Sequence, residues 1–284
     1  MRHIDEDTIT QAVIARHAAA GDARLREVMT SLVQHLHTFA REAKLSQAEW
    51  AAGLHFVAEC ARRGGADDSD PKPQELVLLS DALGLSTLVA ALDRRSLKGG
   101  GTESTVPAIF FHADGVPHAA AGGPGAGADD ELCFVRGCVR TTDGRAITGA
   151  DVRVWPSGAD GAVRTLQSNG DGSFLVRCAE AQAQPIPNDG PVGRLLAALG
   201  RHPWRPAHLH FMISAPGHAP LVTHVFRKGS PYLDSDAVFG VRSSLVADWV
   251  RHEAGCTPDG QHSAVPFTTL DFEFVLNPTT GDKP

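Results

Sequence analysis

Two histidines separated by one residue are the feature of this sequence best suited to metal chemistry. His208 and His210 lie in a stretch of alternating polar and apolar residues, and side chains two apart on a strand point to the same face. The two imidazoles can therefore reach one point, and imidazole binds iron, copper and zinc. Two histidines on the solvent face of a half-buried strand have the same spacing, so this pair alone leaves both interpretations open.

Two further side chains could act at the same point. Arg205 lies between two prolines, three residues before His208, so its guanidinium is expected to be held near the pair. A fixed cation there would stabilise negative charge that develops on a substrate, and a surface salt bridge is the alternative role. His224 shares one face of a predicted strand with Val222 and Phe226 and is expected to point inward. It is a buried structural histidine, a third metal ligand or a proton carrier.

Helical periodicity dominates the N-terminal third of the chain. Apolar residues recur there every three or four positions, at Leu25, Val28, Met29, Leu32, Val33, Leu36, Phe39 and Ala40. Ser46 and Glu49 form a capping box, which predicts the start of a second helix. A third helix is expected to run from Leu76 to Leu92.

The pattern changes to short alternating runs after a glycine-rich stretch at residues 99–101. These runs predict strands at 132–140, 150–155, 173–177, 207–214, 220–226, 237–242 and 269–276. Several short strands separated by turn residues are typical of a β-sandwich with long loops. We therefore predict an α+β protein with a helical region over residues 1–100 and a β-sandwich carrying the metal site over residues 101–284.

Composition excludes several classes of protein. The chain has 284 residues, and its 26 Lys and Arg face 33 Asp and Glu, so a net charge of −7 gives no basic surface for nucleic acid. The N-terminus is polar, and no apolar run approaches membrane-spanning length, which predicts a cytoplasmic protein without a membrane segment. Five scattered cysteines without a Cys-x-x-Cys pair predict reduced thiols rather than disulfides or a zinc knuckle.

Taken together, these segments resemble the intradiol ring-cleavage dioxygenases, most closely the hydroxyquinol and catechol 1,2-dioxygenase branch. The matching motifs lie in order at residues 32–37, 78–84, 102–106, 185–193, 205–210, 214–217 and 230–239. The resemblance implies a β-sandwich that carries a non-haem ferric ion. It also implies a homodimer formed through the N-terminal helices, with a bound lipid at the interface, and a small aromatic diol and dioxygen as substrates.

The resemblance also assigns individual residues. The family's two iron-binding histidines fall on His208 and His210, and its active-site arginine falls on Arg205. His224 matches a pocket position that is glutamine in the catechol enzymes. Asp81 lies in the helical segment that lines the family's substrate pocket.

The chain departs from the family at the metal and ring-binding positions. The two tyrosinate ligands of the family fall on Phe111 and Gln184, and the single tyrosine of this chain, Tyr232, belongs to another motif. Ala108 and Ile109 replace a Gly-Pro pair beside the ring pocket. Phenolate oxygens neutralise the charge of a trivalent ion, whereas neutral imidazoles suit a divalent ion such as iron, copper or zinc.

Three functions are compatible with this pattern. The first is an oxygenase of catechol- or hydroxyquinol-type rings whose rewired site uses His208, His210 and a third donor from among His224, His112 and Gln184. The second is a catalytically silent homologue that binds an aromatic ligand or pairs with an active subunit. The third is a different metal-assisted reaction on the same scaffold, such as hydrolysis. We favour the first because Arg205, both histidines and Asp81 are all present.

Overall fold

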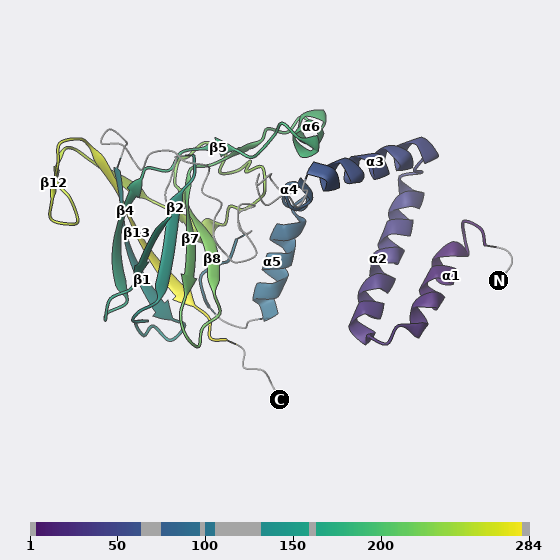
Figure 1. Ribbon diagram of the computed structural model, residues 1–284, viewed down its shortest axis with the longest axis horizontal. Coiled ribbons are helices and arrows are strands. Elements are labelled where there is room, and N and C mark those ends of the chain that lie inside the picture. Colours follow the sequence, from purple (N-terminus) through teal and green to yellow (C-terminus); the bar gives the residue numbers. More distant parts are fainter. Residues whose placement is uncertain (1–3, 64–74, 97–99, 106–131, 159–162, 280–284) are drawn as a thin grey trace. The chain divides into compact units, whose positions relative to one another are not determined.

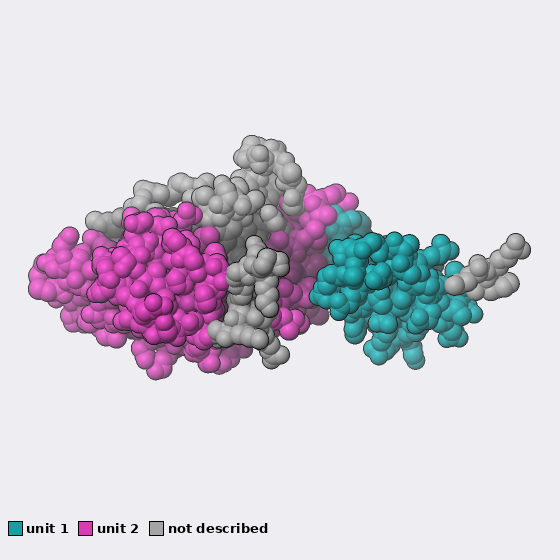
Figure 2. Space-filling view, turned by 90° about the horizontal axis from the view of Figure 1, so that it is seen from below, with its two compact units in different colours: residues 1–58 teal, residues 59–284 magenta. Residues whose placement is uncertain are grey.

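The computed structural model describes residues 4–63, 75–96, 100–105, 132–158 and 163–279. The chain forms two compact units, Met1–Ala58 and Glu59–Pro284, which are described separately here (Figure 2). This division by spatial contacts differs from the division by secondary structure at residue 100, which stays a prediction.

The first unit is helical, as its periodicity predicts. It contains α1 (Ile9–Arg16), the short 3-10 helix η1 (His17–Ala19), α2 (Ala23–Glu42) and the beginning of α3 (Gln47–Arg63). The capping box is confirmed, because Glu49 Oε2 accepts the Ser46 N–H at 2.8 Å and Ser46 Oγ accepts the Glu49 N–H at 3.3 Å. The outer part of the apolar stripe of α2 is about half exposed, at Leu25, Val28, Leu32, Leu36 and Phe39.

The predicted single helix from Leu76 to Leu92 is wrong, because two helices occupy that segment. They are α4 (Glu75–Ala82) and α5 (Leu85–Ser96), and Gly84 between them has a φ of +73°, which a continuous helix does not allow. In the described part of the chain, no single helix is long and apolar enough to span a membrane. Among the described helices, α4 and Leu85–Leu92 together have the length and composition, but these two segments meet at a 74° bend.

Both helices belong to the second unit and are hydrogen-bonded to its loops. The Ala82 carbonyl oxygen at the end of α4 accepts a hydrogen bond from Arg201 Nη1 at 2.7 Å. Thr87 Oγ1 on α5 donates a hydrogen bond to the Val238 carbonyl at 3.1 Å. The helices therefore contribute to the same structure as the strands that follow them.

Two packed β-sheets form the body of the second unit (Figure 1). The four-stranded sheet has the order β10-β13-β1-β4, formed by Trp249–His252, Phe267–Leu276, Leu132–Thr141 and Ser173–Ala179. The five-stranded sheet has the order β3-β2-β7-β8-β9, formed by Arg164–Gln167, Asp151–Pro156, His208–Ser214, Leu221–Arg227 and Val246–Ala247. Short elements complete the unit, namely β5 (Gln184–Pro185), α6 (Pro191–Ala198), β6 (Trp204–Arg205), η2 (Ser243–Leu245), β11 (Gly255–Cys256) and β12 (His262–Ser263).

The core lies between the two sheets, which confirms the predicted α+β fold with a sandwich. Leu209, Phe211 and Ile213 on β7 are fully buried and pack with Phe274 of the opposite sheet. Fully burying a side chain of this size contributes about 2 kcal/mol to stability. Because these residues alternate along β7, the residues between them must face the other side of the sheet.

The strand predicted at 237–242 is also wrong. The segment is a turn in which Phe239 has a φ of +56°, and the carboxylate of Asp236 accepts the N–H groups of Val238 (3.4 Å) and Gly240 (2.9 Å). A side chain that binds the backbone in this way competes with strand pairing. The other six predicted strands are present.

Candidate metal centre

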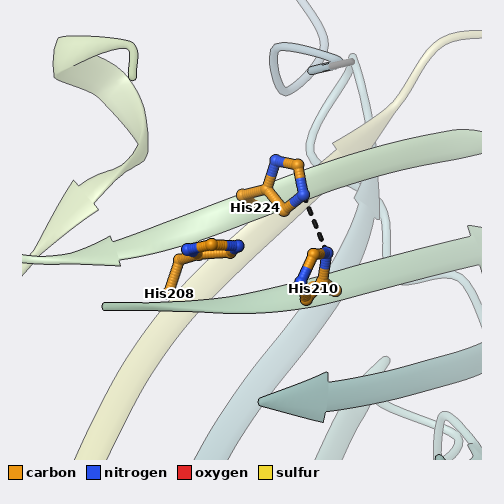
Figure 3. A group of neighbouring side chains, drawn as sticks. All are labelled: His208, His210 and His224. Carbon is orange, nitrogen blue, oxygen red and sulfur yellow. Dashed lines mark hydrogen bonds between the residues drawn. The ribbon is translucent and has the colours of Figure 1, made fainter. Parts of the chain in front are cut away.

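Three buried histidines converge on the face of the five-stranded sheet that is turned away from the core (Figure 3). His208 and His210 come from β7, and His224 comes from β8, directly opposite His210 in the strand register. Their exposed fractions are 0%, 5% and 1%, and one ring nitrogen of each lies within 4.8 Å of the others. The period-two prediction that His208 and His210 share a face is confirmed, and the solvent-face alternative is excluded.

The hydrogen bonds of His208 leave one nitrogen free. Its Nδ1–H donates to the Pro206 carbonyl oxygen at 2.7 Å, so Nε2 carries the lone pair. That Nε2 is buried, and it has no hydrogen-bond partner in the described part of the chain. An imidazole held through one nitrogen, with an unpaired lone pair on the other, has the arrangement of a metal-binding histidine.

The other two rings are linked to each other. His224 Nε2 lies 2.8 Å from His210 Nδ1, and His224 Nδ1 lies 2.6 Å from Thr105 Oγ1. The indole of Trp155 stacks parallel to the His210 ring, with 4.9 Å between centroids. These contacts restrain the orientations of the His210 and His224 rings.

The cluster is electrically neutral at physiological pH. Burial lowers the pKa of His208, His210 and His224 well below the ordinary 6.5. The positive charge of Arg205 acts in the same direction on the pKa of all three rings. Neutral imidazoles keep their lone pairs available, which is the state that binds metal ions.

Arg205 is held by a buried carboxylate. Its Nε lies 3.0 Å from Asp236 Oδ1, and its Nη2 lies 3.4 Å from Asp236 Oδ2. Both residues are buried, so the surface salt bridge considered from sequence is excluded. Gly240 makes room for the pair, because a Cβ at that position would lie 2.9 Å from Arg205 Nη2.

The variant Asp236→Asn is expected to lower the free energy of unfolding by about 3 kcal/mol, because it leaves a buried guanidinium without a charged partner. Urea unfolding of the full chain measures this loss. Asp271→Asn is the matched control: Asp271 pairs with Arg136 at 2.6 Å, but the two side chains are 62% and 54% exposed. Its cost should stay below about 1 kcal/mol. Equal losses in the two variants would contradict the expectation.

Asp81, expected from the resemblance to line the substrate pocket, is a buried carboxyl group on α4. It is 1% exposed, and its Oδ1 has no hydrogen-bond partner in the described part of the chain. Burial raises the pKa of Asp81 to about 6, against smaller opposite effects of the Ser86 hydrogen bond and the charge of Arg205. A buried carboxyl with a raised pKa and an unpaired oxygen is typical of a functional site.

The raised pKa of Asp81 has a consequence for stability. Between about pH 4 and pH 6 the folded protein binds the Asp81 proton more tightly than the unfolded chain, whose pKa is near 3.8, so stability falls as pH rises. Asp81→Asn removes this effect and should raise the free energy of unfolding at pH 7 by up to about 3 kcal/mol. The difference between variant and parent in urea unfolding should therefore grow from pH 4 to pH 7, and a constant difference would contradict this.

Gln184, a candidate third donor, has a hydrogen-bonded side chain. Its amide oxygen accepts the Gly158 N–H at 2.8 Å, and its backbone pairs with Arg205 between β5 and β6. The remaining candidates from sequence, Ala108, Ile109, Phe111 and His112, lie outside the described residues.

Two groups that position the site were missed from sequence. Asp236 was not recognised as the partner of Arg205, although a buried arginine requires an anionic partner. Thr105 was seen only as part of a motif, and its contact with His224 depends on the backbone bond from Thr105 N to the Val222 carbonyl at 3.1 Å. One sequence cannot select either partner from the many carboxylates and hydroxyls of the chain.

Comparison with known proteins defines the class. Residues 124–278 match the Dioxygenase family model, and residues 22–101 match the model of the catechol dioxygenase N terminus. The chain therefore belongs to the intradiol dioxygenase family, in its hydroxyquinol and catechol branch. This confirms the predicted family and, at that level, the predicted type of enzyme.

Individual relatives match over nearly the whole chain. The chain is 49% identical to 6-chlorohydroxyquinol 1,2-dioxygenase of Cupriavidus pinatubonensis, over 98% of this chain and 100% of that relative. It is 40% identical to hydroxyquinol 1,2-dioxygenase of Nocardioides simplex, over 96% of each. The crystal structure of hydroxyquinol 1,2-dioxygenase from Pseudomonas putida DLL-E4 aligns with a TM-score of 0.82 and 37% identity, covering 96% of this chain and 98% of that one.

Proposed function

We propose that the chain is a non-haem metal-dependent oxygenase that acts on a catechol- or hydroxyquinol-type ring with dioxygen. The observation that carries the metal dependence is the buried Nε2 of His208 beside His210, which has no hydrogen-bond partner among the residues that the structure describes. An orphaned lone pair in a neutral, water-excluded cluster costs free energy unless a ligand uses it. The relatives named above support the ring chemistry, since their names specify hydroxyquinol or its chloro derivative.

The donors in the part of the chain that the structure describes do not fit the ferric ion that the family resemblance implies. Tyr232, the single tyrosine, stacks on Trp204 with 5.7 Å between centroids, and the tilted ring of His202 lies 4.9 Å from it. In the described part of the chain, the metal-binding group consists of three histidines without a carboxylate or thiolate. A trivalent ion requires anionic donors, whereas neutral imidazoles suit a divalent one.

Each site residue has a role in this proposal. A divalent metal held by His208 and His210 would supply Lewis acidity toward the adjacent hydroxyl oxygens of the ring. Arg205, fixed by Asp236, stabilises negative charge on the bound diol. His224 lies next to the ligands His208 and His210 and takes part in the same site. Asp81 contributes a polar contact to the substrate, and we keep Ala108, Ile109, Phe111 and Gln184 as residues of the ring pocket.

The test combines metal analysis with oxygen uptake. We expect close to one divalent transition metal per purified full-length chain and oxygen consumption with catechol or hydroxyquinol. Metal-free protein without oxygen uptake would overturn the proposal and support the silent homologue. Bound metal without oxygen uptake would also overturn it, and would point to another metal-assisted reaction on this scaffold.

We also propose a homodimer that forms through the N-terminal helices and holds a lipid there. The half-exposed apolar stripe of α2 supports this proposal, because such a continuous face is costly in water. Light scattering should give twice the mass of the 284-residue chain. Leu32→Glu, in the middle of the stripe, should give the monomer mass, whereas Gln34→Glu on the same helix should leave the dimer intact. A parent protein with the monomer mass would contradict the proposal.

A further inference from the structure

We infer that His224 is the third ligand of an all-imidazole centre for a divalent transition metal. The inference deepens the proposed function, because it names the third donor and the class of ion at the same site. It rests on metal binding by His208 and His210 and is independent of the reaction that follows.

The placement of His224 brings its nitrogen to the other two rings. The ring centroids of His224 lie 4.5 Å from His210 and 4.8 Å from His208. Metal–imidazole bonds are about 2.0–2.1 Å long, so two ligands at 90–110° lie about 2.9–3.4 Å apart. The 2.8 Å between His224 Nε2 and His210 Nδ1 is about a tenth of an ångström short of that range. The ligand atoms of all three rings lie within 4.8 Å of one another, so ring rotations that bring all three nitrogens into that range would admit an ion.

The outer hydrogen bonds of His208 and His224 follow one pattern. His208 Nδ1–H donates to the Pro206 carbonyl, and His224 Nδ1 has Thr105 Oγ1 at 2.6 Å on the side away from the cluster. With its Nδ1–H donated to Thr105, His224 presents the lone pair of Nε2 inward, as His208 does. Such an oxygen partner on the outer nitrogen is what orients metal-binding histidines.

The positions of the protons on the three rings also permit metal binding. In the arrangement just described, the proton between the linked rings belongs to His210 Nδ1, which donates to His224 Nε2. An ion that replaces this hydrogen bond requires the His210 proton to move to its own Nε2. No ring needs to become charged, and all three imidazoles then donate one lone pair each.

The charges around the cluster select the ion. Arg205, held by Asp236, exerts its positive charge on all three rings, and this charge repels an added cation. Within the residues that the structure describes, the cluster contains no Asp, Glu or Cys ligand that would offset the additional positive charge of a trivalent ion. The site therefore favours a divalent ion. Among divalent ions, nitrogen donors favour Cu²⁺, Ni²⁺, Zn²⁺ and Co²⁺ over Fe²⁺.

The test measures metal binding by metal-free, full-length protein. Co²⁺ titration followed by calorimetry and visible absorption should give one site per chain. Pulsed EPR of the Cu²⁺ form should count three imidazole nitrogens in the parent and two in His224→Gln. The same variant should bind Co²⁺ about a hundredfold more weakly. His252→Gln is the matched control, because His252, like His224, is paired with a threonine hydroxyl, Thr269 Oγ1 at 2.9 Å, and it should leave both readouts unchanged.

Thr105→Val keeps the His224 ring and removes only the oxygen that orients it. It should weaken Co²⁺ binding about tenfold or more, and it decides the question if His224→Gln does not fold. Unchanged Co²⁺ affinity in Thr105→Val together with two imidazoles on Cu²⁺ in the parent would overturn the inference. So would unchanged affinity in folded His224→Gln.

The outcomes separate this inference from the proposed function. Co²⁺ bound through His224 without oxygen uptake by any metal-loaded form would refute the oxygenase and leave the three-histidine centre in place. Oxygen uptake by the parent, together with Co²⁺ affinity unaffected by His224→Gln, would refute the centre and leave the oxygenase in place.

Discussion

His208→Ala is expected to abolish stoichiometric metal binding, with a fall in divalent-metal affinity on the order of a thousandfold. His208 is the cluster member whose ring is already oriented by the Pro206 carbonyl and whose Nε2 has no partner in the described part of the chain. Its loss removes one of the ligands on which every metal-dependent interpretation of the chain relies. Calorimetric titration with Zn²⁺ or Co²⁺ measures the change, and urea unfolding checks that the variant is folded.

His218→Ala is the matched control for this prediction. His218 Nδ1 also lies 3.0 Å from a proline carbonyl two residues earlier, that of Pro216, but the ring is remote from the cluster. The control should retain the parent's affinity. If His208→Ala retained it as well, the ion would be bound elsewhere, and the proposed centre would have to be abandoned.

The double variant Phe111→Tyr/Gln184→Tyr is expected to convert the site to one that holds ferric iron. Two phenolates add two negative charges and two hard oxygen donors, which a trivalent ion requires and three imidazoles lack. Position 184 pairs with Arg205 in the β5–β6 ribbon, and Arg205 acts on all three histidines. The new protein should therefore be coloured by phenolate-to-iron absorption, whereas the parent should show no such band.

Phe110→Tyr/Gln182→Tyr controls for tyrosine content, since it adds the same two groups to the same two segments at neighbouring positions. It should remain colourless with ferric iron. A phenolate-to-iron band in the parent protein would mean that Tyr232, its single tyrosine, reaches the metal and that the assignment of the family's ligand positions is wrong. Absence of the band from folded Phe111→Tyr/Gln184→Tyr would mean that these positions do not face the histidines.

Local patterns predicted most of the secondary structure correctly. The capping box at Ser46 places the start of α3, because a cap depends on residues within one turn. The alternation along β7 separates the core residue Leu209 from His208 and His210 for the same local reason. The two errors, at Gly84 and Phe239, occur where a single left-handed residue interrupts an otherwise regular pattern. Hydrophobic periodicity does not report such a conformation.

The site itself was predictable only in part. The Arg205, His208 and His210 positions follow from spacing within six residues of chain, together with the family motif. The partners Asp236 and Thr105 lie 31 residues from Arg205 and 119 residues from His224. Contacts over such separations depend on how strands and loops pack, so sequence spacing carries no information about them.

The amino-acid sequence by itself determined the family, the shared face of His208 and His210, and the absence of any second tyrosine that could supply a phenolate pair. The tertiary structure decided that His224 lies beside the two histidines. It lies there because the β7–β8 register sets it opposite His210, and the amide oxygen of Gln184 accepts a hydrogen bond from the Gly158 N–H. Period-two alternation fixes which face of its own strand a residue occupies, but only pairing between strands fixes which residue it meets.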